Sequence, residues 1–270
     1  MKPLANFMNL VQNENMKIYS RIRTWIMLGL IVLIPILISI IVLLAGGGDD
    51  TSSWSMMLLE SIFVFMLITI FTVVVASDSV AGEFSQGTIK LLLIRPWSRS
   101  SILLSKYIAT ILFAIGFTIV AFVVMLLVNI ACFGYSSGSQ ELSDGMLTGI
   151  SDWNFILQVY LFRFITLILI VTFGFMMSSA FRSSGLAIGL SIAFLLAGNI
   201  ITGLFAMADK PWVKYVLFMH LDLSSYINGG SGPIPNHPTT LGFSLAVLAV
   251  YFVIFNAISW TVFTKRDVAA

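Results

Sequence analysis

Six long runs of apolar residues alternate with less apolar segments of different lengths along the chain. The runs cover about residues 25–45, 58–76, 107–133, 164–181, 185–207 and 241–263. A helix needs about 20 mostly apolar residues to cross roughly 30 Å of hydrocarbon, whereas a barrel strand alternates apolar and polar residues over about ten positions. Because the runs are apolar on every side, we expect six membrane-spanning helices. The predicted fold class is an all-α polytopic membrane protein, with residues 1–270 in a single transmembrane domain.

The composition supports a membrane protein and excludes several other classes. Of the 270 residues, 59% are hydrophobic and 10% are charged, and the mean hydropathy is +1.01. Soluble domains have roughly 45–50% apolar and 25% charged residues. The formal net charge of +2 is too small for a nucleic-acid interface, which needs a dense basic face. The single Cys132 excludes a disulfide framework and multi-cysteine metal sites.

Basic residues mark one side of the membrane. Eleven of the 14 lysine and arginine residues lie near the two chain ends or in the connections after the second and fourth runs: Lys2, Lys17, Arg21, Arg23, Lys90, Arg95, Arg99, Lys106, Arg182, Lys265 and Arg266. Together, the connections 46–57, 134–163 and 208–240 contain seven acidic residues and three basic ones. Since lysine and arginine accumulate in short cytoplasmic loops, we expect both termini in the cytoplasm.

The segment before the first run, residues 1–23, has the pattern of an amphipathic helix. Its apolar residues recur at intervals of three, four or seven, and Lys17, Arg21 and Arg23 lie near its membrane end. Such a helix lies in the headgroup layer with its bases near anionic lipid. Its role is either passive anchoring to membrane lipid or contact with a cytoplasmic partner. The first apolar run is too long for a signal peptide, so we expect it to be retained.

The connection formed by residues 77–106 is too apolar for a plain solvated loop. Phe84, Ile89 and residues 91–94 expose apolar surface there unless lipid or another protein covers them, and charged residues surround them. Gly82 and Gly87 have the spacing of a phosphate-binding loop. However, Thr88 and Ile89 stand where that motif needs Lys and then Ser or Thr, so we expect no nucleotide site in this chain.

The same connection resembles the permease subunits of type-2 ATP-binding-cassette (ABC) exporters. The residues that carry the resemblance, in order along the chain, are Glu83, Gly87-Thr88, Leu91-Leu92, Pro96, Arg99 and Lys106. The N-terminal stretch Asn13 to Lys17, followed by basic residues and Thr24-Trp25, is similar to bacterial members with bacitracin-type or antimicrobial-peptide export roles. The resemblance covers the whole topology, but its specific motif spans only about thirty residues.

This resemblance implies that a coupling helix lies between the second and third spans. The segment from Glu83 to Leu93 would bind a groove of a separate cytoplasmic ATPase, which holds the ATP and magnesium, while this chain holds no cofactor. Glu83 can cap a helix or pair with a base, Gly87 permits a tight turn, and Phe84 with the leucine run supplies an apolar contact. Pro96 fixes the chain direction before the third span. The alternative is a basic interfacial loop that only obeys the orientation rule.

The fifth span carries a strip of small residues. Gly185, Gly189, Ala193 and Ala197 recur every four positions, which permits a close approach of another helix. The approaching helix belongs either to the same bundle or to a second permease copy or related permease.

Polar groups inside the spans are few, which argues against an ion-coupled carrier, because such carriers bury carboxylates near mid-membrane. Glu60 and Arg163 lie near outer ends of spans, where Arg163 is expected to extend to the interface. Asn129 and Asn199 either hydrogen-bond between helices, which we favour, or line a cavity. His220 lacks the further ligands of a metal site, and no nucleophile motif is present, so we expect no enzyme, catalytic residue or metal.

Residues 208–240 are expected to form an external loop with a short interfacial or re-entrant helix.

These observations together predict the permease subunit of an ATP-driven exporter in a bacterial plasma membrane. An apolar lining rich in Met and Phe suits an amphipathic or lipid-like substrate, such as an antimicrobial peptide or drug, which would link the protein to antibiotic resistance. Two other classes stay open: a non-transporting membrane anchor or sensor subunit, and an ion-coupled secondary carrier.

Overall fold

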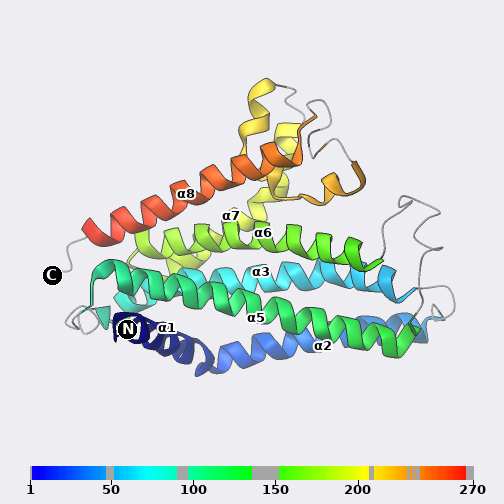
Figure 1. Ribbon diagram of the computed structural model, residues 1–270, viewed down its shortest axis with the longest axis horizontal. Coiled ribbons are helices and arrows are strands. Elements are labelled where there is room, and N and C mark those ends of the chain that lie inside the picture. Colours follow the sequence, from blue (N-terminus) through cyan, green and yellow to red (C-terminus); the bar gives the residue numbers. More distant parts are fainter. Residues whose placement is uncertain are drawn as a thin grey trace.

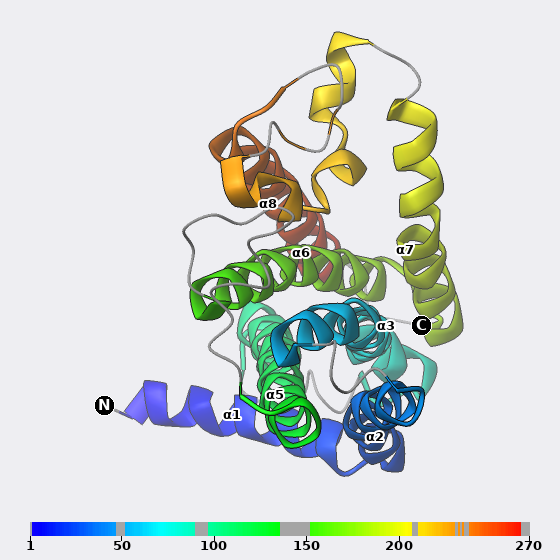
Figure 2. The ribbon, with the colours of Figure 1, turned by 90° about the vertical axis from the view of Figure 1, so that its right-hand side faces the viewer.

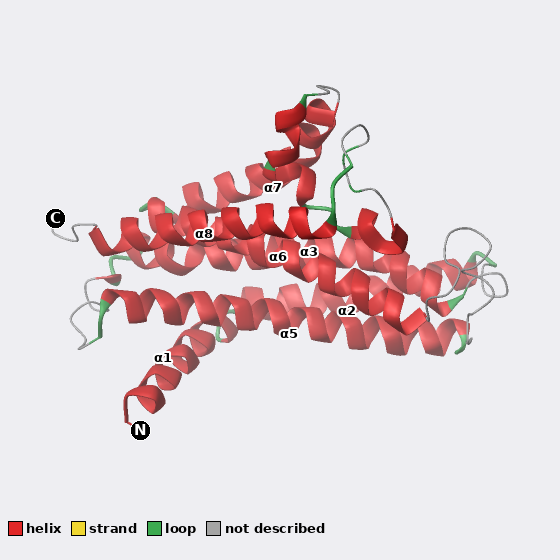
Figure 3. Cartoon of the chain, turned by 45° about the horizontal axis from the view of Figure 1, so that its top comes forward, coloured by secondary structure: helices red, strands yellow, loops and turns green. Residues whose placement is uncertain are grey.

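The computed structural model describes residues 2–46, 52–89, 97–135, 152–206, 210–229, 232, 234 and 238–265. The described residues form helices and loops without a strand (Figure 3). The helices are α1 (Lys2–Tyr19), α2 (Ile22–Leu44), α3 (Ser53–Ser85), α5 (Arg99–Phe133), α6 (Asp152–Ala180), α7 (Ser184–Ala206) and α8 (Leu241–Lys265). Six of them, α2, α3, α5, α6, α7 and α8, are long and apolar enough to cross a membrane. The predicted all-α polytopic membrane fold is confirmed.

The helices form an elongated bundle with α3 at its centre. Seen along the bundle, α2, α5, α6 and α7 surround α3, and α8 lies on the far side of α6 (Figure 2). The first helix, α1, lies across the direction of the spans and packs against α5. The end of α3, the start of α5 and the end of α8 share one end of the bundle with α1 (Figure 1). We call this the termini end.

Three spans are longer than the apolar runs indicate. The helix expected over residues 58–76 covers Ser53–Ser85, that over 107–133 covers Arg99–Phe133, and that over 164–181 covers Asp152–Ala180. Serine side chains cap the N-termini of α3 and α5: Ser52 Oγ accepts from Ser55 N at 3.2 Å, and Ser98 Oγ accepts from Ser101 N at 3.1 Å. The connection between α3 and α5 is therefore residues 86–98, shorter than the expected 77–106.

The lengths of α3 and α5 carry both helices beyond the bilayer. Their 33 and 35 residues correspond to roughly 50 Å at about 1.5 Å per residue, whereas the hydrocarbon is about 30 Å thick. Polar side chains such as Asp78 and Lys106 therefore lie on helices that extend out of the apolar layer.

The main core forms where α3 meets α2, α5 and α6. Val64 and Ile68 of α3 and Phe113 and Phe117 of α5 are fully or almost fully buried within it. A second cluster joins α6 to α8 through Leu169, Phe173, Leu248 and Phe255. Since α3 contributes to contacts with four other spans, displacement of α3 affects most of the bundle.

The segment before α8 folds as three 3₁₀ helices, η1 (Pro211–Tyr215), η2 (Leu217–His220) and η3 (Ser224–Gly229). No helix long enough to re-enter the membrane occurs among residues 210–229. The buried ring of His220 lies against the Lys214 carbonyl (Nε2 to O, 2.8 Å) and Ser244 Oγ (2.7 Å from Nδ1). Burial lowers the pKa of this imidazole, and only the hydrogen bond to the Lys214 carbonyl opposes that effect. His220 is thus a neutral residue that holds η2 against α8.

Candidate coupling site

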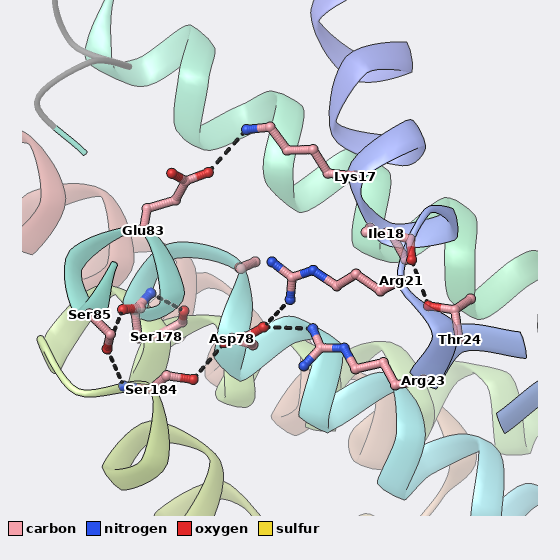
Figure 4. Close-up of polar contacts among 12 residues, drawn as sticks. Lys17, Ile18, Arg21, Arg23, Thr24, Asp78, Glu83, Ser85, Ser178 and Ser184 are labelled. Atoms are coloured by element: carbon pink, nitrogen blue, oxygen red, sulfur yellow. Dashed lines mark hydrogen bonds and ion pairs between the residues drawn. The ribbon is translucent and has the colours of Figure 1, made fainter. Parts of the chain in front are cut away.

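The last two turns of α3, residues 78–85, form the centre of a polar network at the termini end of the bundle (Figure 4). We call these residues the α3 end. Their carboxylates contact α1, the start of α2, α5 and α7, and their backbone N–H groups donate to α6. The network thus joins most of the bundle at the point where α3 leads into the expected coupling segment.

Glu83 lies at the centre of the first part of this network. Its Oε1 accepts from Lys17 Nζ of α1 at 3.0 Å and from Lys106 Nζ of α5 at 3.2 Å. Its Oε2 accepts from the Thr88 hydroxyl, which lies just after the helix. The expectation that Glu83 pairs with a base is confirmed, and the pairing links three segments that are distant in sequence.

Glu14 of α1 completes this group. Its two carboxylate oxygens accept from Lys17 Nζ and Lys106 Nζ, each at 2.8 Å. The Lys106 side chain is only 2% exposed, whereas that of Lys17 is 40% exposed. Lys106 is therefore a buried cation between two carboxylates. Removing any one of these charges leaves a buried charge without compensation, which is strongly destabilising.

Two pKa values in α1 reflect this pairing. Burial alone raises the pKa of Glu14, but Lys106 and Lys17 outweigh it, so the pKa lies below its ordinary value. Burial alone lowers the pKa of Lys17, but Glu14 and Glu83 outweigh it and the pKa is raised. Both groups are therefore charged throughout the neutral range.

Asp78 forms the second part of the network. It accepts from Arg23 Nη2 at 2.6 Å, from Arg21 Nη1, and from Ser184 Oγ of α7 at 2.5 Å (Figure 4). Gly82 lies one turn further along α3, and a Cβ there would lie 2.7 Å from Asp78 Oδ1. A glycine at this position therefore lets the carboxylate fold close to the helix and reach the arginines.

Hydroxyl groups attach the α3 end to α6 and α7. Ser178 Oγ of α6 accepts from the backbone N–H of both Val80 and Ala81, each at 2.9 Å. Ser85 Oγ donates to the Arg182 carbonyl at 3.1 Å and accepts from Ser184 N at 2.9 Å. Ser178 and Ser85 therefore hold the α3 end against α6 and the start of α7.

The start of the expected coupling segment is described as far as residue 89. Gly87 has a φ of +70° and its N–H donates to the Phe84 carbonyl at 3.2 Å, which is the turn that ends α3. The predicted tight turn at Gly87 is confirmed. This turn brings Thr88 back to Glu83.

The apolar residues of the segment are less exposed than the sequence indicates. Phe84 is half-buried and packs against the main core, and Ile89 is buried in it. Arg99 Nη1 donates to the Thr264 carbonyl at 3.1 Å and so joins α5 to the end of α8. Leu91, Leu92 and Pro96 lie outside the described residues, and their coupling roles stay predictions.

A small cavity lies within the network, between α1, α3 and α5. Its volume is about 40 Å³, and its lining includes Glu14, Arg21, Asp78 and Lys106. One water needs roughly 10–15 Å³ on this measure, so the cavity suits a few waters and is far too small for a nucleotide. No group of three or more His, Cys, Asp or Glu positioned for a metal ion occurs in the part of the chain that the structure describes.

The sequence indicated part of this site. Glu83, Gly87 and Thr88 come together as the motif suggests, whereas the partners Glu14 and Asp78 were not predicted. The sequence pattern places Lys17, Arg21 and Arg23 near anionic lipid, whereas in the structure all three form ion pairs with carboxylates. A signal was present, because Glu14 and Asp78 are acidic residues in segments rich in lysine and arginine, where ion pairs can form.

The small-residue strip of α7 faces away from its own bundle. Gly185, Gly189 and Ala193 are exposed and Ala197 is partly exposed, and a Cβ built on Gly189 meets no atom within 4 Å. Packing within the described part of the chain does not explain the strip. Its contact with a second permease copy stays a prediction.

The Arg163 side chain of α6 contacts α3. Its Nη1 donates to Ser61 Oγ of α3 at 2.8 Å, and its guanidinium lies 5.6 Å from the centroid of the Phe65 ring. Hydrogen bonding and a cation–π contact between α3 and α6 hold this side chain inside the bundle.

Comparison with known proteins shows the family to which the chain belongs. Residues 34–269 match the model of a family described as "Protein of unknown function (DUF2705)". The chain is similar to "Uncharacterized protein YhcI" of Bacillus subtilis (strain 168), with 38% identity over 205 residues that cover 74% of this chain and 64% of that protein. It thus matches less than two thirds of the length of YhcI. "Uncharacterized membrane protein YdbK" of the same organism is 28% identical over 200 residues, covering 73% of this chain and 76% of that protein.

Proposed function

The chain belongs to the DUF2705 family, and we propose that this member is the transmembrane permease subunit of an ATP-driven, type-2 ABC exporter. In this proposal the chain lies in the bacterial plasma membrane with both termini in the cytoplasm. It exports an amphipathic or lipid-like substrate, such as an antimicrobial peptide or drug, and thereby contributes to antibiotic resistance. A separate cytoplasmic subunit binds ATP and magnesium and hydrolyses the nucleotide, so this chain itself is not an enzyme.

One observation carries the proposal: Glu83 joins the start of the expected coupling segment to two other helices. Its carboxylate contacts Thr88 on the segment, Lys17 on α1 and Lys106 on α5. An ATPase that displaces residues 87–89 therefore displaces α3 together with α1 and α5. This is what a coupling element requires, because closure of the ATPase must move several helices at once.

The Asp78 half of the network extends the same linkage. Asp78 connects the α3 end to the start of α2 through Arg23 and to the start of α7 through Ser184. Motion at the coupling segment thus reaches α7, whose small-residue strip we assign to contact with a second permease copy or a related permease. Two such copies would enclose the export route between them.

Co-purification with the ATPase tests the proposal. We would express the permease in its host with an affinity tag, solubilise it in detergent, and identify any co-purifying chain that carries ABC ATPase motifs. The variants are Glu83→Gln, which keeps the size of the side chain, and Gly87→Trp. Asp222→Asn is a matched control, because it removes an exposed carboxylate outside the network.

The proposal predicts an ATPase with wild type and with Asp222→Asn. Gly87→Trp should lose the ATPase while still inserting in the membrane. Glu83→Gln should keep binding but reduce substrate-stimulated ATP hydrolysis after reconstitution in nanodiscs. ATPase binding without any translocation would favour the anchor or sensor class. Transport by the purified chain alone would favour an ion-coupled carrier and end the exporter proposal.

A further inference from the structure

A buried carboxylate lies far from the network at the termini end. Glu60 is on the second turn of α3, about 10 Å along the helix from Ser53 at roughly 1.5 Å per residue, and it is 0% exposed. Its neighbours are Ser39, five residues before the end of α2, and Asn129, four residues before the end of α5. The three residues therefore join α2, α3 and α5 near the opposite end of the bundle.

The three side chains form a closed ring of hydrogen-bonding contacts. Ser39 Oγ lies 2.6 Å from Glu60 Oε1 and 3.3 Å from Asn129 Oδ1. Asn129 Nδ2 donates to Glu60 Oε2 at 2.7 Å and to the Met125 carbonyl at 2.9 Å. The second of these bonds fixes the orientation of the amide, because a backbone carbonyl accepts only from the nitrogen side. Asn129 Oδ1 must therefore face Ser39.

Counting protons around the ring determines the state of Glu60. The Ser39 hydroxyl has one proton, which it can give either to Glu60 or to Asn129 Oδ1. If Glu60 is ionised, the serine proton goes to the carboxylate and Asn129 Oδ1 is left without a donor. If Glu60 carries a proton, it donates to Ser39, Ser39 donates to Asn129, and Asn129 donates back to Glu60. Only the protonated carboxyl satisfies every group.

The charges around Glu60 agree with a neutral carboxyl. Among the described residues, no lysine, arginine or histidine forms an ion pair with it. On the neighbouring α6, Tyr160 hydrogen-bonds toward Met125 (3.8 Å to Sδ), and Arg163 donates to Ser61 rather than to Glu60. An isolated charge in an apolar medium costs so much that the group neutralises instead.

We propose that Glu60 is a proton-binding site, and that the bound proton closes the ring with Ser39 and Asn129 and so holds α2 against α3 and α5. The ligand is the proton itself. Loss of the proton leaves a buried, unpaired carboxylate and an unsatisfied amide oxygen, and α2 must then move to relieve both. This inference concerns the opposite end of the bundle and does not depend on the proposed ATPase.

Infrared spectroscopy of the purified full-length chain in nanodiscs tests the proton directly. The carbonyl stretch of a protonated carboxylic acid is well separated from the carboxylate stretch. At neutral pH, the difference spectrum between wild type and Glu60→Gln should contain a protonated-acid band assignable to Glu60. The control Asp222→Asn should lack such a band, because Asp222 is exposed to solvent and lies outside the ring. If the Glu60→Gln difference spectrum instead contains a carboxylate band, Glu60 is ionised and the proposal is wrong.

The stability of the variants provides a second test. A glutamine amide at position 60 can donate to Ser39 and accept from Asn129, so Glu60→Gln keeps the ring closed. We expect its thermal unfolding midpoint to equal that of wild type, whereas Asn129→Leu, which opens the ring, should have a lower midpoint. If Glu60→Gln lowers the midpoint as much as Asn129→Leu does, the ring does not contain a neutral carboxyl and the proposal is wrong.

Discussion

Replacement of Lys106 by methionine tests the network at its most buried charge. Methionine keeps most of the length of the side chain and removes the ammonium group that contacts Glu14 and Glu83 at 2.8 and 3.2 Å. The change leaves two carboxylates in a site where Glu14 is 8% and Glu83 15% exposed. Lys106→Met should therefore destabilise the protein mainly through the uncompensated carboxylates.

The magnitude follows from burial. Removing one partner of a buried ion pair costs about 3–5 kcal/mol. Lys17 still contacts both carboxylates after the change, so we expect the lower end, about 3 kcal/mol. Lys17→Met makes a matched comparison, because Lys17 contacts the same two carboxylates but is 40% exposed. Solvent screening should limit its cost to about 1 kcal/mol.

Unfolding in mixed micelles, titrated with sodium dodecyl sulfate and followed by tryptophan fluorescence, measures both costs. The prediction is a clear order, with Lys106→Met the more destabilising variant by about 2 kcal/mol. Equal costs for the two variants, or a larger cost for Lys17→Met, would refute the reasoning that burial makes Lys106 the central charge.

Three further predictions concern the turn after α3, the pH dependence and the α7 strip. Gly87→Ala should lower the free energy of unfolding by about 1 kcal/mol, because alanine disfavours a positive φ, whereas Gly242→Ala at an open position in α8 should be neutral; equal effects would contradict this. Because the pKa of Glu14 is lowered in the folded state, its ionised carboxylate stabilises the fold at pH values above its ordinary pKa of 4.5. This contribution to the free energy of unfolding is lost as the pH falls from 4.5 through the lowered pKa. In Glu14→Gln that portion of the pH slope, measured by the same unfolding titration, should disappear, and an unchanged slope would exclude Glu14 as its source. With the native cysteine replaced, Gly189→Cys should form a disulfide-linked dimer in membranes more readily than Leu161→Cys on exposed α6, and the reverse order would place the contact elsewhere.

The six spans could be predicted because their apolar runs are long and continuous, which is the strongest pattern a sequence provides. The ends of the spans were harder to predict. An apolar run ends where the helix leaves the hydrocarbon. The helix itself continues further: α3 extends to Ser85, and α5 already begins at Arg99. Helices that extend into the polar layer leave no hydropathy signal, although Ser52 and Ser98 are suitable caps.

The site was predictable where its residues are close in sequence. Glu83, Gly87 and Thr88 form one turn, so their proximity follows from spacing alone. The partners of Glu83 lie 66 residues before it and 23 residues after it, and only the packing of α1 and α5 on α3 brings them together. The ring around Glu60 was missed for the same reason, because Ser39 and Asn129 belong to different spans.

The most direct test of the coupling role is a photo-cross-link from the turn after α3 to the ATPase. Gln86 is exposed beside Gly87, so a photoreactive residue at this position would report contact there. Tyr135, exposed just after the other end of α5, is the control position. The account predicts a cross-link from position 86, and none from position 135, to a chain that mass spectrometry identifies as an ABC ATPase. No such product from position 86 in membranes that contain the assembled transporter would contradict the account.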